Sequence, residues 1–147
     1  MGPLWNLANS LKARRESLAR LLDDHGVRPT PQRLLIAELM LTQACHLSAD
    51  QVLERLRESG TRVSKATVYN TLNLFSTHGL LREIAVDPTR LFYDSTTAGH
   101  HHLYNEDTGE LVDIASGDIE ISRLPELPAG ADVQSIDVVI RVRNRPA

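Results

Sequence analysis

The 147-residue chain contains a single cysteine, Cys45, and no Cys-x-x-Cys pair. One cysteine excludes an intramolecular disulfide, and the missing pairs exclude a zinc site built from cysteines. No apolar run approaches the roughly 18 to 20 residues that span a bilayer, and the N-terminus lacks the apolar core and small-residue cleavage site of a signal peptide. We therefore expect a soluble, cytoplasmic protein with no disulfide and no membrane partner.

Acidic and basic residues are distributed unequally along the chain. Residues 1–98 carry 12 Lys and Arg against 10 Asp and Glu, a balance of +2, whereas residues 99–147 carry 4 against 9, a balance of −5. A mildly basic part followed by an acidic part suggests a module that binds a polyanion joined to a module with another task. Ordinary variation of surface charge is the alternative, so charge alone does not decide.

Four helices are predicted in the first part of the chain. Leucines recur at helical spacing from Leu4 to Leu22, and apolar residues at similar spacing follow in three later stretches. Proline or serine marks the starts and glycine marks the ends. The first helix ends at His25-Gly26, the second opens at Pro29-Thr30-Pro31, the third runs from its cap Ser48 to Gly60, and the fourth runs from its cap Ser64 to Gly79.

After Gly79 the pattern becomes strand-like. Two apolar runs, Leu80–Val86 and Leu91–Tyr93, are separated by the turn residues Asp87-Pro88. Helices followed by a two-stranded hairpin form a winged helix, a variant of the helix-turn-helix. We therefore expect an α+β protein in which residues 1–94 form a winged-helix DNA-binding domain.

Residues 95–147 are expected to form a small α/β domain for dimerisation and metal sensing. The pattern predicts strands at His100–Asn105 and Glu110–Ile114, a short helix around Asp118–Leu124 and a last strand at Val133–Val142. A domain of this length buries only a marginal core. We therefore expect it to need a second copy of the chain to form a stable fold. A dimer would place two DNA-binding domains on an inverted repeat.

The fourth helix carries a polar face opposite its apolar one. Val68, Leu72 and Phe75 define the apolar face, so the opposite face could enter the major groove of double-stranded DNA, where lysine reaches phosphate and asparagine reads adenine. A solvated helix face is the alternative for such a stripe. Basic residues elsewhere are candidates for contacts to backbone phosphates. The candidate DNA-binding residues are Arg14, Arg15, Arg28, Arg33, Lys65, Thr67, Tyr69, Asn70 and Asn73.

Potential metal ligands gather near the junction of the two parts. Successive side chains of a strand point to opposite faces, so His100 and His102 project together while His101 points away. Asp113 joins them if the hairpin pairs it with His102, but a shift of one residue would turn it away. Nitrogen and oxygen ligands without thiolate suit Fe(II), Mn(II) or Zn(II). The candidate ligands are His46, Asp94, His100, His102 and Asp113.

Two other classes of function remain open at this point. Histidines and carboxylates on strands can also hold a catalytic ion, as in a small metalloenzyme. No separate general base stands out, which argues against that class, so we expect no enzyme activity. The other class is a structural interaction module with an incidental wing. An exposed polar strand is the plain alternative for the histidine run.

Three motifs carry a resemblance to a known family. They are Val27-Arg28-Pro29-Thr30-Pro31-Gln32-Arg33, Ala66-Thr67-Val68-Tyr69-Asn70-Thr71-Leu72, and GHHHLYNEDTGELVDI from Gly99 to Ile114. The set resembles the ferric uptake regulator family over about residues 15–143, with most similarity to its iron-response regulator subgroup. The resemblance implies a repressor of iron and haem homeostasis genes.

The resemblance also implies roles for particular residues. The regulatory metal site of the family maps onto His46, Asp94, His100, His102 and Asp113, and a second metal or haem site maps loosely onto His101, Glu120 and Asp137. Asn105 and Thr108 stand where the family has the first cysteine pair of a structural zinc site, so no such zinc is expected. A cysteine-proline haem motif is absent, because His46 follows Cys45.

Peroxide-sensing members of the family share the five-ligand pattern, with aspartate at the position of Asp113. In those members Fe(II) drives oxidation of histidine ligands. Peroxide sensing is therefore the alternative to iron or haem sensing within the same family.

Overall fold

The chain forms two compact units, residues 1–97 and 98–147, which are described separately. The computed structural model describes residues 3–43, 45–96, 101–115 and 117–146, with side chains from residue 10 onward. Helices and strands together make it an α+β protein, as predicted. Within the described residues, no helix combines the length and the apolar character that a membrane span requires.

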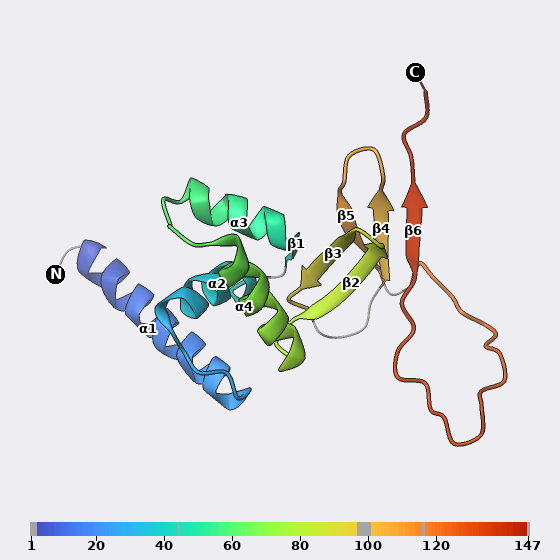
Figure 1. The fold of residues 1–147 in the computed structure, drawn as a ribbon, viewed down its shortest axis with the longest axis horizontal. Coiled ribbons are helices and arrows are strands. Elements are labelled where there is room, and N and C mark those ends of the chain that lie inside the picture. The colour runs from blue at the N-terminus through green and yellow to red at the C-terminus, as the bar shows by residue number, and fades with distance from the viewer. Residues whose placement is uncertain (1–2, 44, 97–100, 116, 147) are drawn as a thin grey trace. The chain divides into compact units, whose positions relative to one another are not determined.

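The first unit contains four helices and three strands, coloured from blue to yellow in Figure 1. In chain order they are α1 (Pro3–Asp24), α2 (Pro31–Leu41), β1 (His46–Ser48), α3 (Ala49–Glu58), α4 (Lys65–Thr77), β2 (Arg82–Asp87) and β3 (Arg90–Asp94). All four predicted helices and both predicted strands are present. The two-stranded ribbon β2–β3 after α4 completes a winged helix.

The helix starts follow from the capping residues that the sequence indicated. The hydroxyl of Thr30 accepts a hydrogen bond from the Arg33 amide, with Pro31 in the first helical turn of α2. Ser48 and Gln51 form a reciprocal capping box on α3, and Ser64 caps α4. These bonds satisfy amides that lack a partner inside the helix. They fix the residue at which α4, the expected recognition helix, begins.

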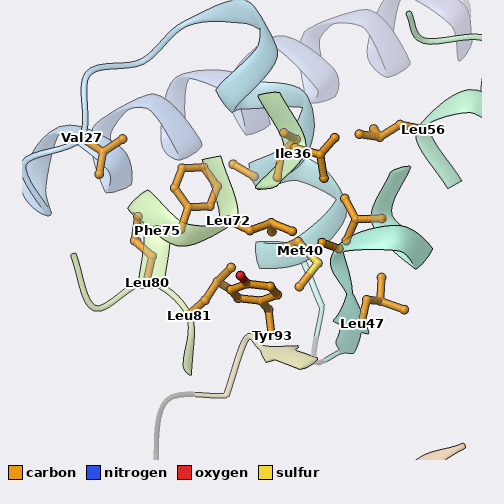
Figure 2. Packing of buried hydrophobic residues seen from close by; sticks show 14 of the residues in the cluster. Val27, Ile36, Met40, Leu47, Leu56, Leu72, Phe75, Leu80, Leu81 and Tyr93 are labelled. Atoms are coloured by element: carbon orange, nitrogen blue, oxygen red, sulfur yellow. The ribbon is translucent and has the colours of Figure 1, made fainter. Parts of the chain in front are cut away.

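One core joins the helices of the first unit to its sheet. Figure 2 shows Leu72 and Phe75 of α4 packed with Met40 of α2, and Leu81 and Tyr93 lie beside them. Leu72, Phe75 and Met40 are fully buried. At the end of α1, Gly26 has φ +77°, and a Cβ there would lie 3.3 Å from Nδ1 of His78, so only glycine fits without strain. This packing leaves the opposite face of α4 in solvent.

The sheet of the first unit has the order β1-β3-β2. Both pairings are antiparallel, and the β2–β3 ribbon contains an irregularity between Ala85 and Asp87. At the tip, the carboxylate of Asp87 accepts hydrogen bonds from the amide and hydroxyl of Thr89, which lower the pKa of Asp87. The strand β1 was not predicted, because three residues are too few for a periodic pattern.

The second unit contains one sheet of three short strands, with the order β5-β4-β6. These are β4 (His101–Asn105), β5 (Leu111–Ile114) and β6 (Val139–Val142). β4 pairs antiparallel with β5 and parallel with β6. Among the described side chains of this unit, the buried ones are Tyr104, Leu111 and His102. Such a core is small for a free-standing fold.

The predicted helix over Asp118–Leu124 is wrong, because residues 117–138 form neither helix nor strand and run as a long loop in Figure 1. A helix of seven residues is marginal without packing, and Pro125 follows it directly. The last strand is also shorter than the predicted Val133–Val142. Large apolar side chains of this loop are 38–49% exposed: Ile121, Leu124, Leu127, Val133 and Ile136.

Candidate metal centre and nucleic-acid interface

Two of the expected metal ligands face each other in the first unit. His46 begins β1, and its register partner in β3 is Asp94. Asp94 is 1% exposed, and its carboxylate accepts a hydrogen bond of 2.8 Å from the Thr96 amide. A carboxylate leaves water at a large cost in free energy unless it is hydrogen-bonded or close to a cation. The missed strand β1 therefore explains how an imidazole and a buried carboxylate become neighbours.

Two further expected ligands form a pair in the second unit. The β4–β5 register places His102 opposite Asp113, which is the register that the ligand hypothesis required. Nε2 of His102 lies 3.1 Å from Oδ1 of Asp113. The His102 side chain is 3% exposed and that of Asp113 is 50% exposed, so the pair joins the interior of the unit to its surface. An atom pair of this kind offers one nitrogen and one oxygen ligand.

The other histidines of the run differ in their surroundings. His100 lies outside the described residues. Nδ1 of His101 accepts a hydrogen bond of 3.0 Å from the Val138 amide. An acceptor nitrogen carries no proton, so in the neutral ring the proton is on Nε2. His101 is therefore tied to the residue that precedes β6, and in this tautomer neither ring nitrogen has a free lone pair for a metal.

The expected second site is not assembled within the described residues. Glu120 and Asp137 are exposed, and no cluster of ligand atoms there contains them together with His101. Residues 117–138 form neither helix nor strand, so no regular element holds these carboxylates beside the histidine. The second metal or haem site stays a prediction.

The paired ligands fit a divalent cation of intermediate hardness. Each pair combines an imidazole nitrogen with a carboxylate oxygen, a donor set suited to Fe(II), Mn(II) or Zn(II). Cys45 precedes His46 and is half-buried, and burial is the main cause that raises the pKa of its thiol. A thiol that keeps its proton is a poor metal ligand. The ligand atoms that the two pairs offer are nitrogen and oxygen.

The outer face of α4 carries the residues expected to contact DNA. Its inward side chains include Val68 and Leu72, which are fully buried. Thr67 is half-buried, and its amide and hydroxyl are both bonded to the cap Ser64. The exposed members of the expected set are Lys65, Tyr69, Asn70 and Asn73. Thr67 therefore serves the start of the helix, and the other four form the accessible stripe.

Asp50 of α3 contacts two residues of this stripe, and the sequence did not single it out. The hydroxyl of Tyr69 donates a hydrogen bond of 3.0 Å to Oδ1 of Asp50. Nζ of Lys65 lies 3.7 Å from the same oxygen and 5.5 Å from the centre of the Tyr69 ring. The hydrogen bond to Asp50 is the main cause that raises the pKa of Tyr69. No sequence pattern links positions 50 and 69, because the helix packing of the unit brings them together.

The expected phosphate-contacting arginines occupy different surroundings. Arg14 forms a surface ion pair with Glu38 at 3.8 Å, and Nη1 of Arg33 donates a hydrogen bond of 2.8 Å to the backbone carbonyl of Arg28. Arg15 lines a mostly apolar pocket of about 250 Å³ beside α2. All four are at least partly exposed and so are able to reach a polyanion, and their contact with DNA stays a prediction.

Two arginines that sequence reasoning missed lie beside the start of α4. Arg57 and Arg62 line an open pocket of about 560 Å³ together with Gln32, Ser64 and Thr67. One cationic side chain comes from α3 and the other from the loop that links α3 to α4. A count of basic residues in α3 could have flagged Arg57. This pocket adjoins the accessible stripe of α4.

The turn between β4 and β5 stands where the resembling family has a cysteine pair. Oδ1 of Asn105 accepts hydrogen bonds from the amides of Asp107 and Thr108, and its Nδ2 donates to Oδ1 of Asn144 at 2.9 Å. Asp107 accepts a bond of 2.7 Å from the Asn144 amide. Side-chain hydrogen bonds therefore link this turn to the residues after β6.

We expect Asn105→Ala to lower the free energy of unfolding by about 1 kcal/mol, the net contribution typical of such hydrogen bonds. Chemical denaturation at fixed protein concentration measures the effect, with and without a chelator. Asn144→Ala and the double variant complete a cycle that isolates the Asn105–Asn144 contact. If the chelator lowers the free energy of unfolding but Asn105→Ala does not, the hydrogen bonds of this turn do not stabilise the unit.

Comparisons with known proteins agree with this arrangement. The model of the ferric uptake regulator family matches residues 24–141. The peroxide-responsive repressor PerR of Staphylococcus aureus is 33% identical over 119 residues, which is 80% of each chain. The match therefore includes both units.

Solved structures with the same fold include two ferric uptake regulators. That of Pseudomonas aeruginosa, determined with manganese, is 26% identical with a TM-score of 0.65 and covers 86% of this chain and 97% of its own. That of Vibrio cholerae has a TM-score of 0.67 at 22% identity and covers 86% and 98%. The chain belongs to the ferric uptake regulator family, whose members are metal-responsive regulators of transcription and not enzymes.

Proposed function

We propose that this chain is a repressor of iron and haem homeostasis genes that binds inverted-repeat DNA as a dimer when a divalent metal occupies its sensor. The observation that carries the proposal is one imidazole–carboxylate pair in each unit. His46 and Asp94 are register partners in the first unit, and His102 and Asp113 are partners in the second. The proposed metals are Fe(II) and Mn(II), with Zn(II) as a further candidate.

The proposed sensor uses both pairs together with His100. A metal bound by ligands from both units would fix the angle between the recognition helix and the second unit. Metal affinity and DNA affinity are then linked reciprocally: bound metal raises the affinity for DNA, and bound DNA raises the affinity for metal by the same factor. The residues of this chain supply the ligand atoms, and the bound cation supplies the positive charge that brings them together.

The DNA interface proposed here is the exposed stripe of α4 with the pocket beside it. Asn70 and Asn73 are suited to read base edges in the major groove, because an amide can bond adenine in two places. Lys65, Arg57 and Arg62 are suited to phosphate contacts, which set position and salt dependence. Their exposure supports the assignment.

A second copy of the chain is the partner proposed for the second unit. Its described core is limited to Tyr104, Leu111 and His102, whereas seven large apolar side chains among its described residues are 38–49% exposed. Monomeric proteins seldom expose this much apolar surface without a partner. The seven are Val112, Ile121, Leu124, Leu127, Val133, Ile136 and Ile140. Two recognition helices related by a twofold axis would then read two half-sites.

Footprinting on the DNA upstream of the chain's own gene tests this function. We expect protection of an inverted repeat in the presence of Mn(II), with loss of protection when a chelator is added. The half-sites should be about one helical turn apart, or a multiple of it. Protection that is identical with and without metal would contradict the sensor, and no protection in either state would contradict the repressor.

Peroxide sensing is the second candidate, favoured by the similarity to the repressor PerR. Thiol oxidation is a poor route here, because burial raises the pKa of Cys45, the single cysteine, and so lowers its thiolate content. Oxidation would therefore have to occur on a histidine ligand.

For that candidate we expect the Fe(II)-loaded protein to gain one oxygen on a histidine-containing peptide after dilute peroxide, as measured by mass spectrometry. Protein loaded with Mn(II) is the control and should stay unmodified, because peroxide does not react readily with that ion. An unmodified histidine peptide from the Fe(II)-loaded protein would exclude peroxide sensing and leave iron or haem as the signal.

A further inference from the structure

An acidic residue lies within the face proposed to meet DNA. Asp50 is the second residue of α3, and its side chain is 69% exposed. Its Oδ1 atom accepts a hydrogen bond of 3.0 Å from the Tyr69 hydroxyl and lies 3.7 Å from Nζ of Lys65. A carboxylate repels phosphate, so its position beside a DNA-binding helix works against affinity. Its contacts with Tyr69 and Lys65 indicate which role in DNA binding it has.

The hydrogen bond fixes the direction in which Tyr69 can interact. A phenol has one proton to donate and lone pairs with which to accept. Because the hydroxyl already donates its hydrogen bond to Asp50, it can only accept further bonds. A phosphate oxygen is also an acceptor, so it cannot bond this hydroxyl. In the major groove the available donors are the amino groups of adenine and cytosine, and the ring edge can contact the methyl group of thymine.

The same carboxylate restrains Lys65. Its ammonium group lies 3.7 Å from Oδ1 of Asp50 and over the Tyr69 ring, 5.5 Å from the ring centre. To contact a phosphate, the Lys65 ammonium group must therefore move away from Asp50 or interact with the carboxylate and the phosphate at once. This reduces the affinity for any duplex, whatever its sequence, because a phosphate contact carries no base information.

We propose that Asp50 is a positioning residue for base recognition. Its hydrogen bond leaves the Tyr69 hydroxyl able only to accept bonds from base edges. Its contact with Lys65 lowers the affinity for DNA of any sequence. The inference rests on the proposed function, since it assumes that α4 reads DNA. It adds a residue outside the recognition helix that sets the ratio of specific to nonspecific binding.

The test measures binding of the Mn(II)-loaded full chain to two duplexes by fluorescence anisotropy over a range of KCl concentrations. One duplex is enriched from a random library by the wild-type protein, and the other is its scrambled version. The variants are Asp50→Ala, Asp50→Asn, Tyr69→Phe and the double variant Asp50→Ala/Tyr69→Phe. Glu54→Gln is the matched control, because it removes one exposed negative charge from the same helix. Thermal melting of each variant checks that it is folded.

We expect Asp50→Ala and Tyr69→Phe each to lower the ratio of preferred to scrambled affinity by roughly fivefold, the discrimination of a single base contact. The double variant should fall no further, because both changes remove the same oriented hydroxyl. Asp50→Asn keeps an acceptor oxygen, so it should retain the ratio while binding both duplexes more tightly with a salt slope steeper by about 1. Glu54→Gln should leave the ratio unchanged.

A wild-type ratio in Asp50→Ala would overturn the inference while leaving the proposed function intact. Additive effects of the two changes would also overturn it. If Asp50→Ala lowers the ratio of preferred to scrambled affinity by the same factor with Tyr69 present and with Tyr69→Phe, then Asp50 acts independently of the tyrosine hydroxyl. A wild-type protein that enriches no duplex from the library would overturn the proposed function itself, and the inference with it.

Discussion

His102→Ala is expected to lower the affinity for Mn(II) by at least ~100-fold and to abolish metal-dependent protection of DNA. Loss of a partner that merely supports a ligand already costs roughly 10- to 100-fold, so loss of the ligand itself should cost more. His102 is 3% exposed and paired with Asp113 at 3.1 Å. Competition with a chromophoric chelator measures the affinity, and elemental analysis of anaerobically purified protein measures the occupancy.

A buried histidine also fills space, so a second variant separates metal binding from folding. Asp113→Asn keeps the size of a side chain that is half exposed, and it removes the charge that favours a cation. It should weaken Mn(II) binding without loss of the circular dichroism of the native chain. His25→Ala, an exposed histidine in the first unit, serves as the control and should retain wild-type affinity. Unchanged occupancy in both His102→Ala and Asp94→Ala would show that the site lies elsewhere.

Leu124→Glu/Leu127→Glu is expected to convert the protein from a dimer to a monomer. These side chains are 49% and 44% exposed in a segment with neither helix nor strand, so charges there should cost the isolated chain little. At an interface with a second copy, the same charges would be buried without partners. Light scattering coupled to size exclusion should then give the mass of one 16.3-kDa chain instead of two.

The loss of the dimer should appear strongly in DNA binding. When two recognition helices are joined, the second half-site binds at a high effective concentration, which adds about 10² to 10⁴ in affinity. The double variant should lose a factor of this order on an inverted repeat and keep its affinity for a single half-site. Leu91→Glu, an exposed apolar residue of β3, is the matched control and should remain dimeric. A double variant that remains a dimer would place the interface outside this loop.

Local signals were enough to predict the helices of the first unit. Capping residues such as Ser48 and Ser64 act within one helical turn, and so does the proline at the start of α2. Buried positions such as Leu72 and Phe75 follow from helical periodicity. These effects depend on neighbours in the sequence, so the sequence displays them directly.

Predictions for the second unit were less successful because the local signals there are weak. The segment around Asp118–Leu124 has apolar residues at a spacing that suits a helix, yet it is not helical. A short amphipathic helix is stabilised mainly by the surface against which it packs. The described part of this unit offers little such surface, as the exposure of Leu124 shows.

The chemical identity of the metal ligands was readable from the sequence, but their pairing was not. Strand alternation separated His101 from His102, and the structure ties His101 to the Val138 amide while His102 faces Asp113. The sequence did not fix the β4–β5 register, and the structure pairs His102 with Asp113. The pairing of His46 with Asp94 depended on β1, a three-residue strand that has no periodic signal.

The sequence by itself determined the lack of an intramolecular disulfide, the helices and wing of the first unit, and the residue types available to a metal and to DNA. Tertiary structure decided which of these residues meet: His46 with Asp94, His102 with Asp113, and Asp50 with Tyr69. The physical reason is the range of the interactions. Caps, turns and periodicity act over a few residues, whereas strand register and helix packing join residues 11 to 48 positions apart, and only the assembled core selects one arrangement among those the sequence permits.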